Sequence, residues 1–120
     1  MASFRIDRDG MSALEFDGVC LARVSTHRAW KHRWTELEIY RTEGGKYVSV
    51  SVGQSTQSGE DALRSARVCH TAQELVQSFI SRSRGSLSQP ALAVLDDAAA
   101  VDDAIDVALS AIEIEVEKIV

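Results

Sequence analysis

The first seventy residues alternate between hydrophobic and polar side chains, which is the two-residue period of half-buried β-strands. Runs of this kind cover residues 3–6, 14–24, 34–42, 46–52 and 62–69. The third and fourth runs are joined by Glu43-Gly44-Gly45, which predicts a β-hairpin. Gly18 interrupts the second run, and an isolated glycine in a strand pattern predicts a bulge or a tight turn there. We therefore predict an antiparallel meander of four or five strands over residues 1–70.

After residue 70 the period changes to that of a helix. Thr71-Ala72-Gln73-Glu74 fits a capping box, in which the hydroxyl and the carboxylate each satisfy a backbone N–H group. Leu75, Val76, Phe79 and Ile80 then form one apolar face, so a short amphipathic helix is expected over residues 71–82. Residues 83–90 contain the single proline and are typical of a linker too short to divide the chain into two domains.

The last thirty residues, 91–120, carry a helical apolar stripe. At 100° per residue, nine apolar positions fall within an arc of roughly 100°. They are Val94, Ala98, Val101, Ile105, Ala108, Leu109, Ile112, Val116 and Ile119. We predict one long acidic amphipathic helix, packed on one face of the sheet. The alternation over residues 112–117 also fits a terminal strand, so the state of residues 111–120 stays open.

The length of this helix has a consequence. About 29 helical residues span roughly 44 Å, whereas a compact domain of this chain length has a diameter near 35 Å, from a radius of gyration of roughly 14 Å. Either the helix breaks or its end projects and leaves Ile112, Val116 and Ile119 to be covered. A homodimer, the groove of a partner, a terminal strand or a bend over the chain's own sheet would each cover them. The expected fold is a single α+β domain over residues 1–120.

Charge is distributed unevenly along the 120 residues. Residues 1–90 hold 12 Lys/Arg and 10 Asp/Glu, a net charge of +2, whereas residues 91–120 hold one Lys and eight Asp/Glu, a net charge of −7. Such asymmetry points to a charged partner or to self-association. The sequence pI of about 5.1 argues against general DNA coating, which depends on dense neutralisation of phosphates.

Several other classes are disfavoured by composition. No apolar run reaches the roughly 18–20 residues that span a bilayer, and Arg5, Asp7, Arg8 and Asp9 do not suit a targeting peptide. Two cysteines do not make a disulfide scaffold, so we expect a reducing cytoplasm and no membrane contact.

Residues 26–34 gather two Trp, two His and three cations. Trp30 could stack on an unpaired base while Arg28, Lys31 and Arg33 hold phosphates. The same residues could form an aromatic and arginine hot spot for a protein, or a loop anchored in the core by its tryptophans.

Metal binding and catalysis have weaker support. Cys20, His27, His32, Cys69 and His70 are potential zinc ligands, but only the two histidines at 27 and 32 have the spacing of a paired ligand set. No nucleophile elbow, phosphate loop or HExxH motif occurs. We expect no catalytic, cofactor or metal site.

Six of the acidic side chains of residues 91–120 would gather on one flank of a continuous helix, and Asp102 is one of the six. The flank could meet a basic partner through the remaining five: Asp96, Asp103, Asp106, Glu113 and Glu117. This favours a small non-enzymatic inhibitor, immunity or anti-defence protein of a bacterium, phage or mobile element, which blocks a basic or nucleic-acid-processing protein. A nucleic-acid-associated module that uses residues 27–34 is the alternative, and a small enzyme or enzyme subunit is the third.

Three short segments, Phe16–Ala22, Tyr40–Val48 and His70–Val76, cover roughly half the chain with their surroundings and resemble the central part of EXLDI-type small bacterial proteins. The order of strand, turn, strand and helix is shared. The resemblance implies no mechanism and assigns no functional residue.

Overall fold

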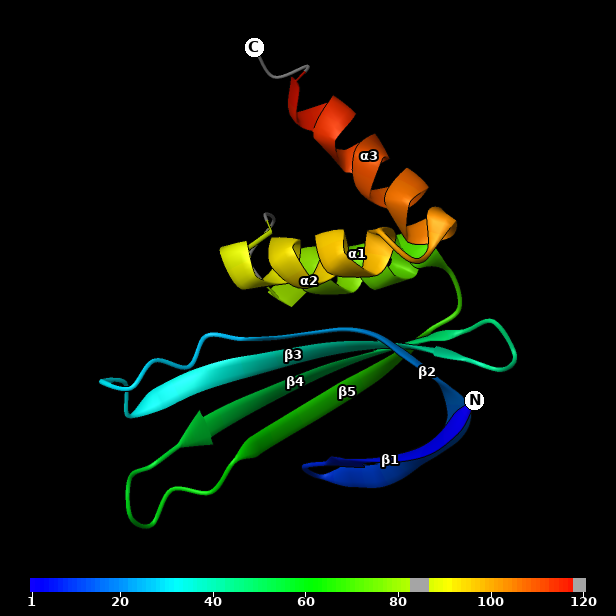
Figure 1. Cartoon of the computed structure of the whole chain (residues 1–120). Coiled ribbons are helices and arrows are strands. Elements are labelled where there is room, and N and C mark those ends of the chain that lie inside the picture. Colours follow the sequence, from blue (N-terminus) through cyan, green and yellow to red (C-terminus); the bar gives the residue numbers. More distant parts are fainter. Residues whose placement is uncertain (83–86, 118–120) are drawn as a thin grey trace.

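The computed structural model describes the backbone of residues 1–82 and 87–117 and the side chains of residues 1–80 and 87–112. It is an α+β fold of five strands followed by helices (Figure 1). The strands are β1 (Ala2–Arg8), β2 (Met11–Ser25), β3 (Arg33–Thr42), β4 (Tyr47–Ser55) and β5 (Leu63–Cys69). The helices are α1 (Ala72–Arg82), α2 (Gln89–Ala99) and α3 (Asp103–Glu117). Among the described residues, no helix is long and apolar enough to cross a membrane.

The sheet confirms the predicted meander and contains five strands. Its order is β1-β2-β3-β4-β5, and every neighbouring pair is antiparallel. The β3–β4 hairpin forms around Glu43-Gly44-Gly45, where Gly45 has a φ of +83° that a residue without a side chain adopts readily. The local alternation of side chains was therefore sufficient to predict the strands and this hairpin.

The long strand β2 belongs to two hairpins and turns the sheet back on itself. Gly18 lies at the corner, opposite Ala2 of β1 and Thr42 of β3. A Cβ atom at this position would lie 2.2 Å from the Arg41 carbonyl oxygen, so the close approach of the two strands requires glycine. The register shift occurs between Cys20 and Ala22, so the bulge lies beyond the glycine that was predicted to mark it.

The sheet carries a hydrophobic core on each face. On one face, Leu37, Ile39 and Tyr47 pack against apolar residues of α1 and α2, including Phe79 and Val94. Figure 1 shows these two helices lying over the sheet and α3 directed away from it. α3 packs mainly against α1 and α2.

The β1–β2 hairpin covers the opposite face of the sheet. Tyr40 of β3 packs against Phe4 and Phe16, with ring centroids 4.7 Å and 5.5 Å away. The hairpin turn is also tied to β5, because Arg64 N–H donates to the Asp9 carboxylate at 2.7 Å and Asp9 N–H donates to the Arg64 carbonyl at 3.0 Å. The curled hairpin thus protects one end of an edge strand that would otherwise expose unpaired backbone groups.

The start of α1 confirms the predicted cap in a slightly shifted form. The Glu74 N–H donates to Thr71 Oγ1 at 3.1 Å, and the Glu74 carboxylate accepts the N–H of His70, rather than that of Thr71, at 2.7 Å. The second helix begins earlier than predicted, at Gln89, where Ser88 Oγ accepts the Ala91 N–H.

The single long helix predicted for residues 91–120 is wrong. α2 ends at Ala99 and α3 begins at Asp103, so the apolar stripe is divided between two helices. Val101, predicted to face the core, lies in the break and is 62% exposed, whereas Asp102, predicted on the acidic flank, is only 5% exposed. The helical backbone of α3 continues through Glu117 and not as a strand, while residues 118–120 lie outside the described part.

Candidate functional site

α2 and α3 present carboxylates without any basic residue among them. Residues 89–117 contain eight Asp/Glu and no Lys, Arg or His. Four of these carboxylates are exposed and have no ion pair within the described structure, and we call them the acidic helical surface: Asp96, Asp97, Asp103 and Asp106. The sequence predicted three of them as partner-binding residues, but the break between the helices removes the common flank on which it placed them. The two remaining residues of that predicted partner-binding set are Glu113 and Glu117. Their backbone belongs to α3, and their side chains lie outside the described part.

The two halves of this surface differ in their local energetics. Asp103 and Asp106 occupy the first turn of α3, where the helix dipole stabilises negative charge. Asp96 and Asp97 lie near the C-terminal end of α2, which has no basic residue in its last turn. Negative charge there opposes the dipole, so helix stability does not account for this pair.

Apolar side chains lie next to these carboxylates. Val101 in the break and Val107 on α3 are 62% and 66% exposed. Ile112, predicted as a contact for a dimer or partner, is partly buried against the chain's own helix-side core. The other two residues of that prediction, Val116 and Ile119, have side chains outside the described part.

Asp102 anchors the junction between α2 and α3, a role that sequence reasoning missed. Its carboxylate accepts hydrogen bonds from Tyr47 Oη at 3.0 Å and 3.1 Å, from Arg41 Nη1 at 3.0 Å and from the Ile105 N–H at 3.1 Å. It therefore caps α3 and also joins that helix to β3 and β4. Burial, followed by the hydrogen bond to this carboxylate, raises the pKa of Tyr47. The available signal was an aspartate before an acidic first turn, which is typical of a helix start.

The basic aromatic loop, residues 26–32 with the first residues of β3, does not act as one surface. Trp30 is 75% exposed, and Lys31 Nζ lies 5.7 Å from its ring centroid. Trp34 is half-buried, and the His27 ring packs edge-on against it at 4.4 Å. The half-buried Trp34 fits a loop anchored by a tryptophan, whereas base stacking and protein contact by the exposed Trp30 stay predictions.

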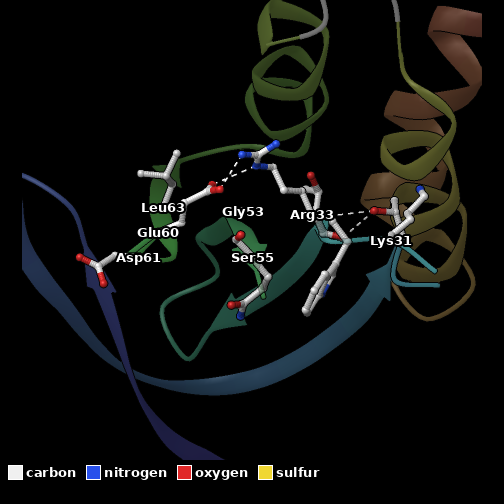
Figure 2. A pocket seen from close by; sticks show the side chains of 11 residues that line it. Lys31, Arg33, Gly53, Ser55, Glu60, Asp61 and Leu63 are labelled. Atoms are coloured by element: carbon white, nitrogen blue, oxygen red, sulfur yellow. Dashed lines mark hydrogen bonds and ion pairs between the residues drawn. The ribbon is translucent and has the colours of Figure 1, made fainter. Parts of the chain in front are cut away.

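Arg33 differs from the two other cations of the loop. It forms a two-pronged ion pair with Glu60, with one bond of 2.9 Å, and Figure 2 shows the two side chains pointing toward one another. Hydrogen bonding from Arg33 lowers the pKa of Glu60. In the described structure Arg28 and Lys31 have no carboxylate partner, so they remain the cations available to a ligand.

Two hollows flank this loop and share Lys31. The first, of about 460 Å³, lies at the ends of β3 and β4 and contains both cations and carboxylates (Figure 2). The second, of about 360 Å³, lies between the loop and the start of α2. The described residues that line it include Arg28, Trp30, Lys31, Ser25 and Pro90, and none of them is a carboxylate. The two hollows therefore differ in charge.

The residues considered for zinc do not form a ligand set. Cys20 lies exposed on β2, where its thiol donates to the Ala22 carbonyl at 3.6 Å, whereas Cys69 is buried at the end of β5. Across the part of the chain that the structure describes, no group of three His, Cys, Asp or Glu side chains is placed to hold a metal ion.

The hydrogen bonds and burial of Tyr40 predict that the stability of the fold depends on pH at alkaline pH. Tyr40 Oη donates to Glu38 Oε1 at 2.9 Å, and Glu38 also pairs with Arg23 at 2.6 Å. Tyr40 is 2% exposed, and this burial is the main cause that raises its pKa from 10.0 to about 12.

We expect the free energy of unfolding to fall as the pH rises from about 10 to about 12, because the unfolded chain loses the tyrosine proton first. Tyr40→Phe keeps the aromatic ring but has no proton to lose. The fall in the free energy of unfolding that Tyr40 causes, on the order of 1–2 kcal/mol, should therefore be absent in this variant. Urea unfolding at a series of pH values checks this. The same decline in wild type and variant would show that Tyr40 does not cause it.

Comparison of the chain with protein-family models, with curated proteins and with solved structures finds no match in any of the three. The resemblance of the central segments to EXLDI-type proteins stays a prediction.

Proposed function

We propose that this protein is a small, non-enzymatic, cytoplasmic binding protein that blocks a basic protein partner through the acidic helical surface. It would belong to the inhibitor, immunity or anti-defence class, with a nucleic-acid-processing protein as the typical target. One observation carries the proposal: Asp96, Asp97, Asp103 and Asp106 are exposed on two helices that contain no basic residue, and no cation of the described structure neutralises them.

Electrostatic complementarity explains how such a surface would favour binding of a basic partner. Exposed carboxylates without counter-charge steer a basic partner toward the surface and raise the association rate, and they reject acidic competitors. Because α3 is directed away from the sheet, a partner can reach the sides of this helix that do not pack against α1 and α2 (Figure 1).

Exposed apolar groups complete the surface. Interfaces combine an apolar centre with polar and charged groups around it. Val101 and Val107 supply apolar area beside Asp103 and Asp106. In a homodimer in which these helices of two copies face one another, like charges would come together. We therefore favour a basic partner over a second copy of the chain at this surface.

A double substitution at the end of α2 separates binding from folding. Asp96→Lys with Asp97→Lys replaces negative charge at a helix C-terminus by positive charge, which the dipole favours by about 0.3–1 kcal/mol per residue. The variant should therefore be at least as stable as the wild type and yet bind the partner at least tenfold more weakly. Capture from nuclease-treated host lysate, compared with thermal unfolding of both proteins, measures the two effects.

The matched control changes the same amount of charge elsewhere. Glu43→Lys with Asp61→Lys replaces two exposed loop carboxylates, and this variant should capture the partner as the wild type does. If both double variants lose the partner equally, net charge alone governs binding and the assignment to the helices is wrong.

Nucleic-acid binding by the basic aromatic loop is the second candidate function. The exposure of Trp30 favours it, as does the lack of a carboxylate partner for Arg28 and Lys31 among the described residues. The ion pair of Arg33 with Glu60 makes that residue a weaker candidate for a phosphate contact than Arg28 or Lys31.

A further inference from the structure

We propose that the hollow between the basic aromatic loop and the start of α2 binds one nucleotide unit. The base would stack on Trp30, and the phosphate would lie against Arg28 and Lys31. This site is separate from the acidic helical surface, so the proposal neither requires the protein partner nor depends on it.

The charge of the lining residues makes this hollow a better site for an anion than the neighbouring hollow. Arg28 and Lys31 line it, and no carboxylate is among its described lining residues. The hollow on the other side of Lys31 contains Glu60 and Asp61 as well as Arg33, so its cations are largely compensated. An anion is therefore favoured in the first hollow and is not favoured in the second.

The exposed ring of Trp30 favours a ligand that contains an aromatic ring. Trp30 lines the hollow while 75% of its surface remains exposed, and the Nζ atom of its neighbour Lys31 lies over the ring, 5.7 Å from the centroid. Tryptophan is the usual stacking platform for unpaired bases, and stacking requires no particular base because every base has a π-face. An anion that also carries an aromatic ring uses both features of the site.

The volume of the hollow suits a single nucleotide unit, and Ser25 and Arg28 can each donate a hydrogen bond to it. The hollow of about 360 Å³ lies at the lower end of the roughly 300–1,000 Å³ typical of small-ligand sites. Ser25 Oγ accepts the His27 N–H at 3.1 Å, so its own proton can be donated to a ligand oxygen. Arg28 uses Nη1 to bond the His27 carbonyl at 2.8 Å, which leaves the other edge of the guanidinium for a phosphate.

A nucleotide unit could come from a free nucleotide or from a single strand, and tryptophan fluorescence distinguishes these sources. The experiment uses the full chain carrying Trp34→Phe, so that all tryptophan emission comes from Trp30. This Trp34→Phe protein is titrated with adenosine 5′-monophosphate, with a short single-stranded oligoadenylate and with the corresponding duplex. Quenching by the monophosphate equal to that by the strand identifies a free nucleotide, whereas binding of the strand at least tenfold tighter identifies single-stranded nucleic acid.

Charge variants test the assignment to this hollow. Arg28→Ala with Lys31→Ala should weaken binding at least tenfold and flatten its salt dependence. Arg5→Ala with Arg67→Ala removes the same charge from β1 and β5 and should leave binding within twofold of the parent. Absence of quenching with the monophosphate and the strand, or equal loss in both double variants, would overturn the proposal.

Discussion

Replacing Asp102 with alanine is expected to lower the free energy of unfolding by about 2–4 kcal/mol. The substitution removes the cap of α3, which is worth about 1 kcal/mol, and leaves the buried hydroxyl of Tyr47 without its acceptor, which costs about 1–3 kcal/mol. Arg41 loses its ion pair as well, but its side chain is 44% exposed and water can solvate it. Chemical denaturation of wild type and variant measures the loss.

Two further substitutions separate the parts of this effect. Asp102→Asn keeps an oxygen acceptor for the cap and for Tyr47, so it should cost no more than about half as much as the alanine variant. Asp103→Ala changes a neighbouring aspartate that is exposed and should cost less than about 1 kcal/mol. Equal losses for Asp102→Ala and Asp103→Ala would contradict the anchoring role of Asp102.

Replacing Gly18 with alanine should destabilise the protein by about 3 kcal/mol or more. The added Cβ would lie 2.2 Å from the carbonyl oxygen of Arg41, and that oxygen belongs to the backbone of a central strand that cannot move alone. Relief of the overlap requires β2 and β3 to separate at the corner where the hairpin turns across the sheet. Because Tyr40 packs against Phe4 and Phe16 beneath this corner, its fluorescence and near-ultraviolet circular dichroism should change too.

A second glycine provides the control for this prediction. A Cβ atom added at Gly44, in the β3–β4 turn, would lie 3.9 Å from Thr42 Oγ1, which is ordinary van der Waals contact, and Gly44 adopts no left-handed backbone conformation. Gly44→Ala should change the stability by less than about 0.5 kcal/mol. A stability loss at Gly18 as small as that at Gly44 would show that the strands do not approach as closely as described.

The strands could be predicted because the alternation that indicates them lies within short stretches of neighbouring residues. Val48, Val50 and Tyr40 alternate with polar residues, and the Gly-Gly turn fixes the hairpin register, so neighbouring residues contain the information. The curl of the sheet could not be predicted in the same way. It depends on Gly18 meeting Arg41, a contact between residues far apart in the sequence.

The helix break shows how a tertiary contact overrides a periodic pattern. The apolar stripe of residues 91–120 fits one helix, and no proline or glycine interrupts it between Ala99 and Asp103. The break occurs where Asp102 gains buried hydrogen bonds from Tyr47 and Arg41, partners that sequence periodicity does not identify. Asp96, Asp103 and Asp106 are exposed as expected, but Asp102 of the same predicted flank is buried, and the role of the flank in binding stays a prediction.

The association rate of the captured partner, measured as a function of ionic strength, tests the central claim most directly. The acidic helical surface predicts a rate that falls steeply with added salt for the wild type, and a slower, nearly salt-independent rate for Asp96→Lys with Asp97→Lys. The loop variant Glu43→Lys with Asp61→Lys should follow the wild type. Identical rates and salt dependences for the wild type and the helix variant would contradict the claim that these helices bind the partner.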